Sequence, residues 1–537
     1  MRGGATLALA AISLGCVACS PSTSSTSRSA STVLHVDVSD LPSQLAPDNP
    51  WFLASSTMWE PLYSYTPGLG YAPGLVDSLD HTQDDLTWTL HVRPDLKWSD
   101  GQPLDANDVA YSFHHAIDPR NGVSYASNLM LSVKGAAAAE DADPMLPASQ
   151  IQGLVDATGI RVLNSTTVQI VLEHPEVDLE PFLASASLSP LPQHVVERTG
   201  TAKFGTSLAS LVTSGPFLPA SFDHNKGFTL KPNPHYFGPQ PALKEIDVRV
   251  VSGADDANSD LRSGAAQMTD PFDPVFLGQS PDAYFSSPLW HSAASFDIQP
   301  IVFNAQSTTL RSADARRAFA GAINRQVIAD VALSKDASAA TAFFPVGTPG
   351  VSANVAVPSL SAAAAAAAFS AAGITPGTHI RLLYINQGAA AKVAAGVAHD
   401  IGATGLAVDV EAVAPSGVFS RLISGNYDAV IGMHTRPFYP SATSLLDVAW
   451  NLVAGAYGTW PPGDIGAAIT TLQDTTDPAT QPAQTQSVAQ SILQSGAFSP
   501  LTVGKLGWMQ SPRVTGLTID SVALNLERVP FTGVSVH

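Results

Sequence analysis

Cysteine is nearly absent from this 537-residue chain, and its two cysteines, Cys16 and Cys19, both lie close to the N-terminus. A domain that begins after them can form no internal disulfide, so its stability must come from core packing. Charged residues make up only 13% of the chain, with 26 basic side chains against 45 acidic ones. The net charge of −19 argues against a nucleic-acid partner and against a polybasic membrane-binding surface.

The motifs of common enzyme classes are also missing. The sequence contains no H-E-x-x-H, G-x-S-x-G, S-x-x-K, Walker or G-x-G-x-x-G pattern. His114 and His115 are adjacent, but neighbouring helical side chains point about 100° apart, which suits packing better than a shared metal ion. The sequence therefore predicts neither an enzyme nor a cofactor or metal site.

The N-terminus has the pattern of an export signal. Arg2 precedes an apolar run that is too short to span a bilayer and is typical of a signal-peptide core. Small residues precede both cysteines, as in a lipobox, so we predict a lipoprotein signal peptide over residues 1–19. Cys19 is the predicted site of lipidation (palmitate or a similar acyl chain), with Cys16 as the alternative, and a plain secretory signal is the other interpretation. A Ser/Thr-rich tether at 20–32 would connect the lipid to a fold held on the extracytoplasmic face of the cell membrane, in the periplasmic space or cell envelope.

The stretch from residue 86 to 109 carries the strongest signal in the chain. Thr87, Thr89 and His91 alternate with Trp88, Leu90 and Val92, which is the period of a half-buried strand. A turn follows at Gly101, which can adopt a positive φ. Asp105 is a good helix N-cap, and Asp108 comes three residues later, where a carboxylate meets the exposed amides of the first turn.

This stretch closely resembles the signature of extracellular solute-binding proteins of family five, T-F-x-L-R-x-x-x-K-W-S-D-G-x-P-x-x-A-x-D-V. Trp88 replaces the Phe of that pattern and His91 replaces the Arg. The family captures oligopeptides, dipeptides, nickel chelates and similar solutes for ABC importers. Further ordered motifs extend the resemblance from about residue 33 to about 505, and the clearest of them lie at 214–217, 229–238, 302–304, 314–325 and 419–431.

The resemblance implies an α/β, periplasmic-binding-protein-like fold (type II, cluster C), with two main lobes joined by a hinge and an inserted third lobe. The expected boundaries are 33–55, 200–300 and 495–537 for lobe I, 56–199 for lobe II, and 301–494 for lobe III. The hinge linkers are expected near Phe303-Asn304 and from Ser495 to Pro500. Local patterns predict strands at 33–38, 167–172 and 246–251, an alanine-rich helix from Ser361 to Gly373, and an exposed loop at 135–147.

The most informative departure from the family lies in residues 431–441. Peptide-binding members place an aspartate here, in a W-x-x-D setting, to pair with the α-ammonium of the ligand. In this chain Met433 takes the tryptophan position and Arg436 the aspartate position. A guanidinium binds carboxylates or phosphates bidentately, so we expect the ligand to present an anionic or neutral group. The alternative is that Arg436 faces solvent or pairs with Asp447. The other candidate ligand-contacting residues are His434, Phe438, Tyr439, Trp59, Trp290 and Trp450.

These observations predict a monomeric substrate-binding lipoprotein of an ABC importer. It would capture oligopeptides or peptide-like solutes between its lobes and deliver them to a permease driven by separate ATPase subunits. The alternative function is a non-transport envelope lipoprotein that binds or senses a glycolipid or another anionic ligand, which the arginine at position 436 favours. A hydrolase is disfavoured because the catalytic motifs are missing.

Overall fold

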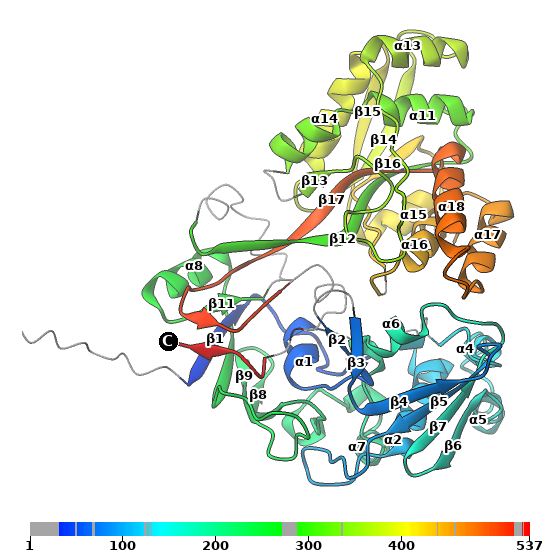
Figure 1. The fold of residues 1–537 in the computed structure, drawn as a ribbon. Coiled ribbons are helices and arrows are strands. Elements are labelled where there is room, and N and C mark those ends of the chain that lie inside the picture. The colour runs from blue at the N-terminus through cyan, green and yellow to red at the C-terminus, as the bar shows by residue number, and fades with distance from the viewer. Residues whose placement is uncertain are drawn as a thin grey trace, which may run out of the picture.

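The chain forms three main sheets, each with its own helices, in a computed structural model. The model describes residues 32–48, 51–66, 70–122, 126–127, 130–270, 287–333, 337–437, 439–455, 458–519, 529 and 531–537. The predicted signal peptide and both cysteines therefore lie outside the described residues. Figure 1 shows two sheets in the lower part of the molecule and the third in the upper part.

Lobe I is built on a five-stranded sheet with the order β11-β1-β10-β9-β8. Its first strand, β1, is parallel to both of its neighbours, and the remaining pairs are antiparallel. Leu34, Val36 and Val38 of β1 are buried, which explains why this apolar alternation forms a strand. The elements of this lobe are β1 (Val33–Val38), α1 (Phe52–Thr57), β8 (Phe217–Asp223), β9 (Gly227–Pro232), β10 (Glu245–Val250), α8 (Ala254–Ser263), β11 (Met268–Thr269), β18 (Val514–Thr515) and β19 (Ser535–Val536).

Lobe II contains a four-stranded antiparallel sheet with the order β4-β5-β7-β6 and a separate hairpin of β2 and β3. The strands are β2 (Tyr63–Thr66), β3 (Gly70–Pro73), β4 (Val76–His81), β5 (Thr87–Val92), β6 (Ile160–Asn164) and β7 (Thr167–Val171). The helices are α2 (Ala106–Ile117), α4 (Ala136–Glu140), α5 (Ala148–Asp156), α6 (Leu179–Leu183) and α7 (Gln193–Thr199). Short 3-10 turns lie at Pro119–Asn121 (η1) and Ala186–Leu188 (η2). Two more, Thr201–Lys203 (η3) and Leu208–Ser210 (η4), lie in the segment that leads from α7 to β8 of lobe I.

Lobe III is built on a six-stranded mixed sheet with the order β13-β17-β12-β16-β14-β15. Its strands are β12 (Trp290–Phe303), β13 (Ala337–Ala339), β14 (His379–Ile385), β15 (Ala407–Val413), β16 (Ala429–Ile431) and β17 (Phe498–Met509). Its α-helices are α11 (Ala313–Ala322), α12 (Arg325–Val327), α13 (Ala362–Ala371), α14 (Ala390–Gly402), α15 (Val418–Ile423), α16 (Ala442–Ala454), α17 (Gly463–Gln473) and α18 (Gln481–Ser495). A π-helical turn (η5, Ile328–Ala332) and a 3-10 turn (η6, Pro415–Gly417) complete the lobe.

Two long strands, β12 and β17, connect lobe III to lobe I, as Figure 1 shows. They pair antiparallel along most of their length, but the register shifts between Ala294 and Ile298. Beyond that irregularity, Met509 N donates to the hydroxyl of Thr269 in lobe I (3.0 Å). At the opposite end, Phe303 pairs with β16 inside the lobe III sheet. A second register shift lies between Gln299 and Pro300, so both irregularities fall between the end of the strand pair that contacts lobe I and the end inside the lobe III sheet. The linkers expected from the sequence, near residues 303–304 and 495–500, lie at the lobe III end of the same strands.

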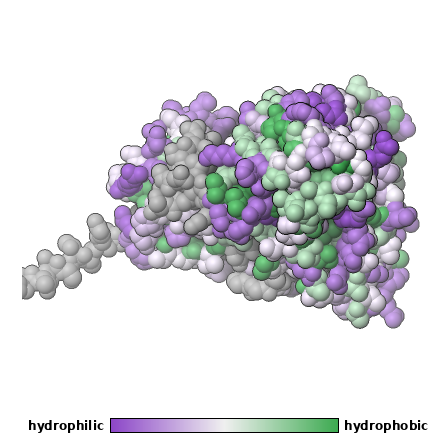
Figure 2. Space-filling view, turned by 90° about the horizontal axis from the view of Figure 1, so that it is seen from above, coloured by the Kyte–Doolittle hydropathy of each residue, from purple (hydrophilic) through white to green (hydrophobic). Residues whose placement is uncertain are grey.

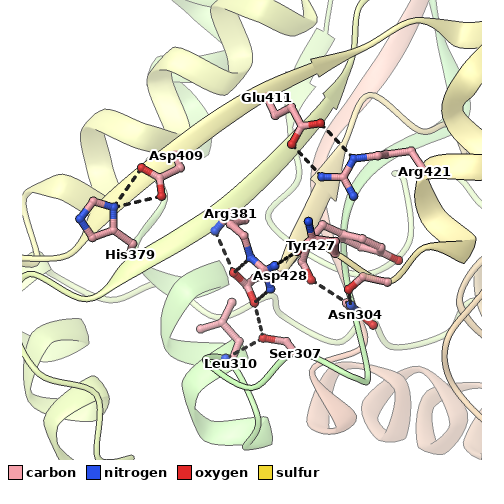
Figure 3. A network of polar contacts seen from close by, with 12 residues as sticks. Asn304, Ser307, Leu310, His379, Arg381, Asp409, Glu411, Arg421, Tyr427 and Asp428 are labelled. Carbon is pink, nitrogen blue, oxygen red and sulfur yellow. Dashed lines mark hydrogen bonds and ion pairs between the residues drawn. The ribbon is translucent and has the colours of Figure 1, made fainter.

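The F-N and Y-D-A motifs meet where β12 ends and β16 begins (Figure 3). Asn304 Nδ2 donates to the carbonyl of Tyr427 (2.8 Å), and Asn304 N donates to the carbonyl of Asp428 (3.1 Å). The Asp428 carboxylate, which is fully buried, accepts hydrogen bonds from Ser307 Oγ (2.6 Å) and from the backbone N–H of Arg381 (2.8 Å). These motif residues therefore hold three segments of lobe III together.

The signature stretch folds as its residue pattern predicts. Trp88, Leu90 and Val92 of β5 are buried, and the residues between them are half-exposed. Asp105 caps α2 with its carboxylate, and the Asp108 carboxylate accepts a hydrogen bond from the backbone N–H of Asp105 (3.2 Å). Asp108 also accepts the indole N–H of Trp98 and the backbone N–H of Gln193, which joins this turn to α7.

Other local predictions are confirmed, and one is wrong. The predicted strands correspond to β1, β7 and β10, and Ser361 caps α13, which is followed by Gly373 at φ 81°. The stretch 135–147 is not simply a loop, because Ala136 begins the short helix α4. Ala139 of this helix packs on Ile151 and Val155 of α5, a contact that the local sequence does not reveal.

The apolar side chains divide between the two parts of the molecule. One cluster runs through lobes I and II, and two others lie within lobe III on either side of its sheet. In the view of Figure 2, hydrophilic side chains are interspersed with hydrophobic ones over the surface. Among the described residues, none of the helices has the length and hydrophobicity needed to cross a bilayer.

Candidate functional site at the junction of the lobes

The loop between β16 and α16 carries most of the predicted ligand-contacting residues. After β16 the chain runs beside β12, where Thr435 and Ile298 exchange two backbone hydrogen bonds (2.8 and 3.0 Å). The loop ends at Ser441, whose hydroxyl accepts from Ser444 N (3.0 Å) and caps α16. The loop is therefore fixed at both ends and lies against the strand that connects the lobes.

His434 and Asp297 form a polar pair on this loop. His434 Nδ1 lies 2.8 Å from Asp297 Oδ2, with the imidazole largely exposed and the carboxylate buried. The hydrogen bond to Asp297 raises the pKa of His434, while the positive charge of Arg436 opposes that rise. Arg436 itself is half-buried. Asp447, its alternative partner in the sequence, accepts a hydrogen bond from Asn451 Nδ2 (3.1 Å).

The end of the loop contacts lobe II. Tyr439 is buried, and its ring stacks on Phe182 of α6 with 6.3 Å between centroids. The Ser441 hydroxyl donates to Asp178 Oδ2 (2.7 Å), and Asp178 also hydrogen-bonds with the Tyr439 side chain. Burial raises the pKa of Asp178 to about 6. The loop that leaves β16 thus joins lobe III to lobe II.

The tryptophan candidates lie elsewhere. Trp59 is fully buried and packs near Phe204 in the core of lobes I and II. Trp450 is 5% exposed in the core of lobe III, and its indole N–H donates to the carbonyl of Pro462 (3.1 Å). Trp290 begins β12 and is half-buried. A Cβ on Gly507 would come within 2.0 Å of its ring, so the indole covers that glycine of β17. Trp59 and Trp450 thus lie in apolar cores and not on the loop between β16 and α16.

The structure thus brings His434, Arg436 and Tyr439 together on one loop. Phe438 lies outside the described residues. The partners of this loop, Asp297 and Asp178, were not found from the sequence. They are 137 and 263 residues away from the side chains that they contact, and no motif marks them.

The remaining polar features do not add a catalytic or metal centre to the described part of the chain. His115 contacts the hydroxyl of Thr201 (3.2 Å), and burial lowers the pKa of both His114 and His115, as expected for packing histidines. No cluster of three or more His, Cys, Asp or Glu side chains among these residues could hold a metal ion. A hollow of about 280 Å³ lies on lobe II beside the signature turn and is lined by residues that include Gln102 and Glu197, none of which belongs to the loop.

Solved structures show the same fold. The chain matches the Escherichia coli murein tripeptide binding protein MppA with a TM-score of 0.73 and 18% identity, over 94% of this chain and 98% of that one. It matches Haemophilus influenzae OppA in complex with the peptide RPPGFSPFR with a TM-score of 0.72 and 18% identity, over 94% and 99%. These matches confirm the predicted periplasmic-binding-protein fold.

The sequence comparisons then identify the family. A family model described as bacterial extracellular solute-binding proteins, family 5 (middle region), matches residues 70–452, and the chain belongs to this family. Its members bind solutes for transport and are not enzymes. The chain is 30% identical over 292 residues to the dipeptide-binding protein of Lactococcus lactis subsp. cremoris (strain MG1363), which is 51% of this chain and 50% of that protein. The match thus spans about half the length of the curated relative.

Proposed function

We propose that this protein is the extracytoplasmic receptor of an ABC importer for oligopeptides or peptide-like solutes. The observation that carries the proposal is the position of the 432–441 loop. This loop belongs to a family-five solute-binding protein, and it touches both the strand that connects the lobes and the surface of lobe II. A solute that contacts two lobes favours the conformation in which they are close, and that conformation would dock on the permease. Relatives named as dipeptide- and oligopeptide-binding proteins support a peptide-like solute.

The solute can be identified directly. The protein is purified from its native host, and the molecules that co-purify are analysed by mass spectrometry. Peptides or peptide conjugates, together with loss of their uptake when the gene is deleted, are the expected result. A glycolipid, with uptake unchanged, would instead support the envelope-lipoprotein function.

Arg436 is proposed to select an anionic or neutral group of the solute. Arg436→Ala should weaken binding of a solute that carries a carboxylate near this position by about tenfold or more, the loss of one charge-assisted hydrogen bond. The matched control is Arg262→Ala on the exposed face of α8 in lobe I, which should bind as the unchanged protein does. Equal affinity of the two variants in calorimetry would remove Arg436 from the site.

The proposed anchor is a lipid on Cys19, or on Cys16 if cleavage occurs earlier. A diacylated cysteine at the new N-terminus would hold the protein on the membrane without a spanning helix. Mass spectrometry of the mature N-terminus distinguishes the two sites. Replacement of the lipidated cysteine by alanine should release the protein from the membrane fraction, and retention by both single variants would contradict the assignment of one site.

A further inference from the structure

A second set of contacts joins lobes II and III next to the loop. Besides the Ser441–Asp178 hydrogen bond, His174 Nδ1 lies 2.8 Å from Asp474 Oδ1. The backbone N–H of Val177 donates to the carbonyl of Gln473 in α17 (3.3 Å). We call the contact between residues 174–182 of lobe II and residues 439–474 of lobe III the acidic seam. In Figure 1 the α6 region of lobe II faces the α16 and α17 end of lobe III.

The acidic seam gathers more negative than positive side chains. Glu176 and Asp178 come from lobe II, and Asp447 and Asp474 come from α16 and the end of α17. Each of the three other carboxylates raises the pKa of Glu176, as expected for like charges held near one another. The other titratable groups that face these carboxylates are His174 on Asp474, Tyr439 and Tyr71 on Asp178, and Glu180, which acts on Tyr71.

We propose that the acidic seam is a proton-operated latch: carboxylates that carry their protons hold lobes II and III together, and ionised carboxylates drive them apart. The latch regulates lobe closure itself, in the absence of any solute. The proposal rests on the positions of four carboxylates, which lie on surfaces that would separate if lobe III turned about β12 and β17.

The direction of the pH dependence follows from the pKa values of the carboxylates while the acidic seam is in contact. Burial and the neighbouring carboxylates raise the pKa of Glu176 from 4.5 to about 8, and burial raises those of Asp178 and Asp447 from 3.8 to about 6. In separated lobes these groups face water and regain ordinary values, so closure takes up protons. The stabilisation of the seam is complete below pH about 4 and is lost progressively as the pH rises to about 8.

The test is small-angle scattering of the solute-free full chain between pH 5 and pH 9. The radius of gyration should rise as the pH is raised to about 8 and then level off. Glu176→Gln removes one ionisable group from the acidic seam and should keep the compact value between pH 6 and pH 8. Asp447→Asn is a second variant with the same expected direction, and Glu140→Gln, on α4 away from the seam, should follow the unchanged protein.

Two outcomes would overturn the latch. One is a radius of gyration of the unchanged protein that does not vary with pH. The other concerns the variants: the radius of gyration of Glu176→Gln and of Asp447→Asn would change with pH as that of the control Glu140→Gln does, although near-UV circular dichroism shows that all three variants are folded. Since no solute is present, failure of the latch leaves the proposed receptor function untouched, and a wrong solute assignment leaves the latch untouched.

Discussion

Asp428 offers the sharpest test of what the family motif Y-D-A does in this chain. Its carboxylate is fully buried and accepts hydrogen bonds from Ser307 Oγ, from the backbone N–H of Arg381, and from Arg381 Nε (3.2 Å) and Nη2 (3.3 Å). Figure 3 shows the carboxylate between these donors. Asp428→Ala removes the acceptor and keeps the donors.

The expected cost comes from the donors that are left behind. The Ser307 hydroxyl is buried, and it and the Arg381 backbone N–H each cost about 1–3 kcal/mol when they lose their acceptor. The Arg381 guanidinium is 39% exposed, so it can return to water and adds only about 0–1 kcal/mol. Together these effects predict a loss of about 2–7 kcal/mol in the free energy of unfolding of lobe III. Asp428→Asn, which keeps one carbonyl oxygen, should cost less.

Urea unfolding followed by tryptophan fluorescence measures this loss, because Trp450 and Trp460 both lie in lobe III. The matched control is Asp409→Ala in β15, whose carboxylate pairs with His379 at 3.0 Å on the exposed surface of the same lobe. That variant should change stability by less than about 0.5 kcal/mol. If Asp428→Ala and Asp409→Ala unfold at the same urea concentration, the buried acceptor does not hold lobe III together.

Three further predictions concern other parts of the chain. Arg325 is buried, and its three guanidinium nitrogens donate to the Pro500 carbonyl, the Pro358 carbonyl and Ser499 Oγ. Lysine has a single ammonium and cannot replace all three hydrogen bonds. Arg325→Lys should therefore lower the free energy of unfolding, measured from the urea midpoint, by about 1.5–3 kcal/mol. Gly227 has φ 125°, and a Cβ there would lie 1.8 Å from the carbonyl oxygen of Val248, so Gly227→Ala should give little folded protein in a near-UV circular dichroism assay. Asp297→Asn should lower the pKa of His434 in an NMR titration, because the carboxylate that stabilises the imidazolium is gone, and an unchanged pKa would contradict the 2.8 Å contact.

The elements whose signals are local could be predicted from the sequence. The alternation in β5, the Asp105 cap of α2, and the Ser361 cap of α13 each need only a few neighbouring residues to be recognised. The helix α4 could not be predicted in this way. The local sequence predicts Ala139 on the surface, but in the structure it packs on Ile151 and Val155 of α5. That contact depends on the tertiary fold and not on neighbouring residues.

The residues of the candidate site also differ in whether a local sequence signal marks them. The ordered motifs place the 432–441 loop after a strand, so His434, Arg436 and Tyr439 could be proposed together from the sequence. An aromatic side chain carries no local sign of whether it lines a surface or fills a core, so the burial of Trp59 and Trp450 could not be predicted from the sequence.

The distribution of apolar contacts is consistent with the lobe motion proposed for this protein. Its two apolar clusters are its own, so turning lobe III leaves most of its buried hydrophobic surface covered. What must break at the acidic seam is a few hydrogen bonds, at about 0.5–1.5 kcal/mol each, and the packing of Tyr439 on Phe182. A solute that binds both lobes therefore needs only a few kcal/mol of differential affinity to favour the closed arrangement of lobes II and III. Protonation of Glu176 and Asp178 contributes a free energy of similar size. In the proposed mechanism, closure is set jointly by ligand and pH, because hydrogen bonds and one ring contact join lobes II and III at the acidic seam.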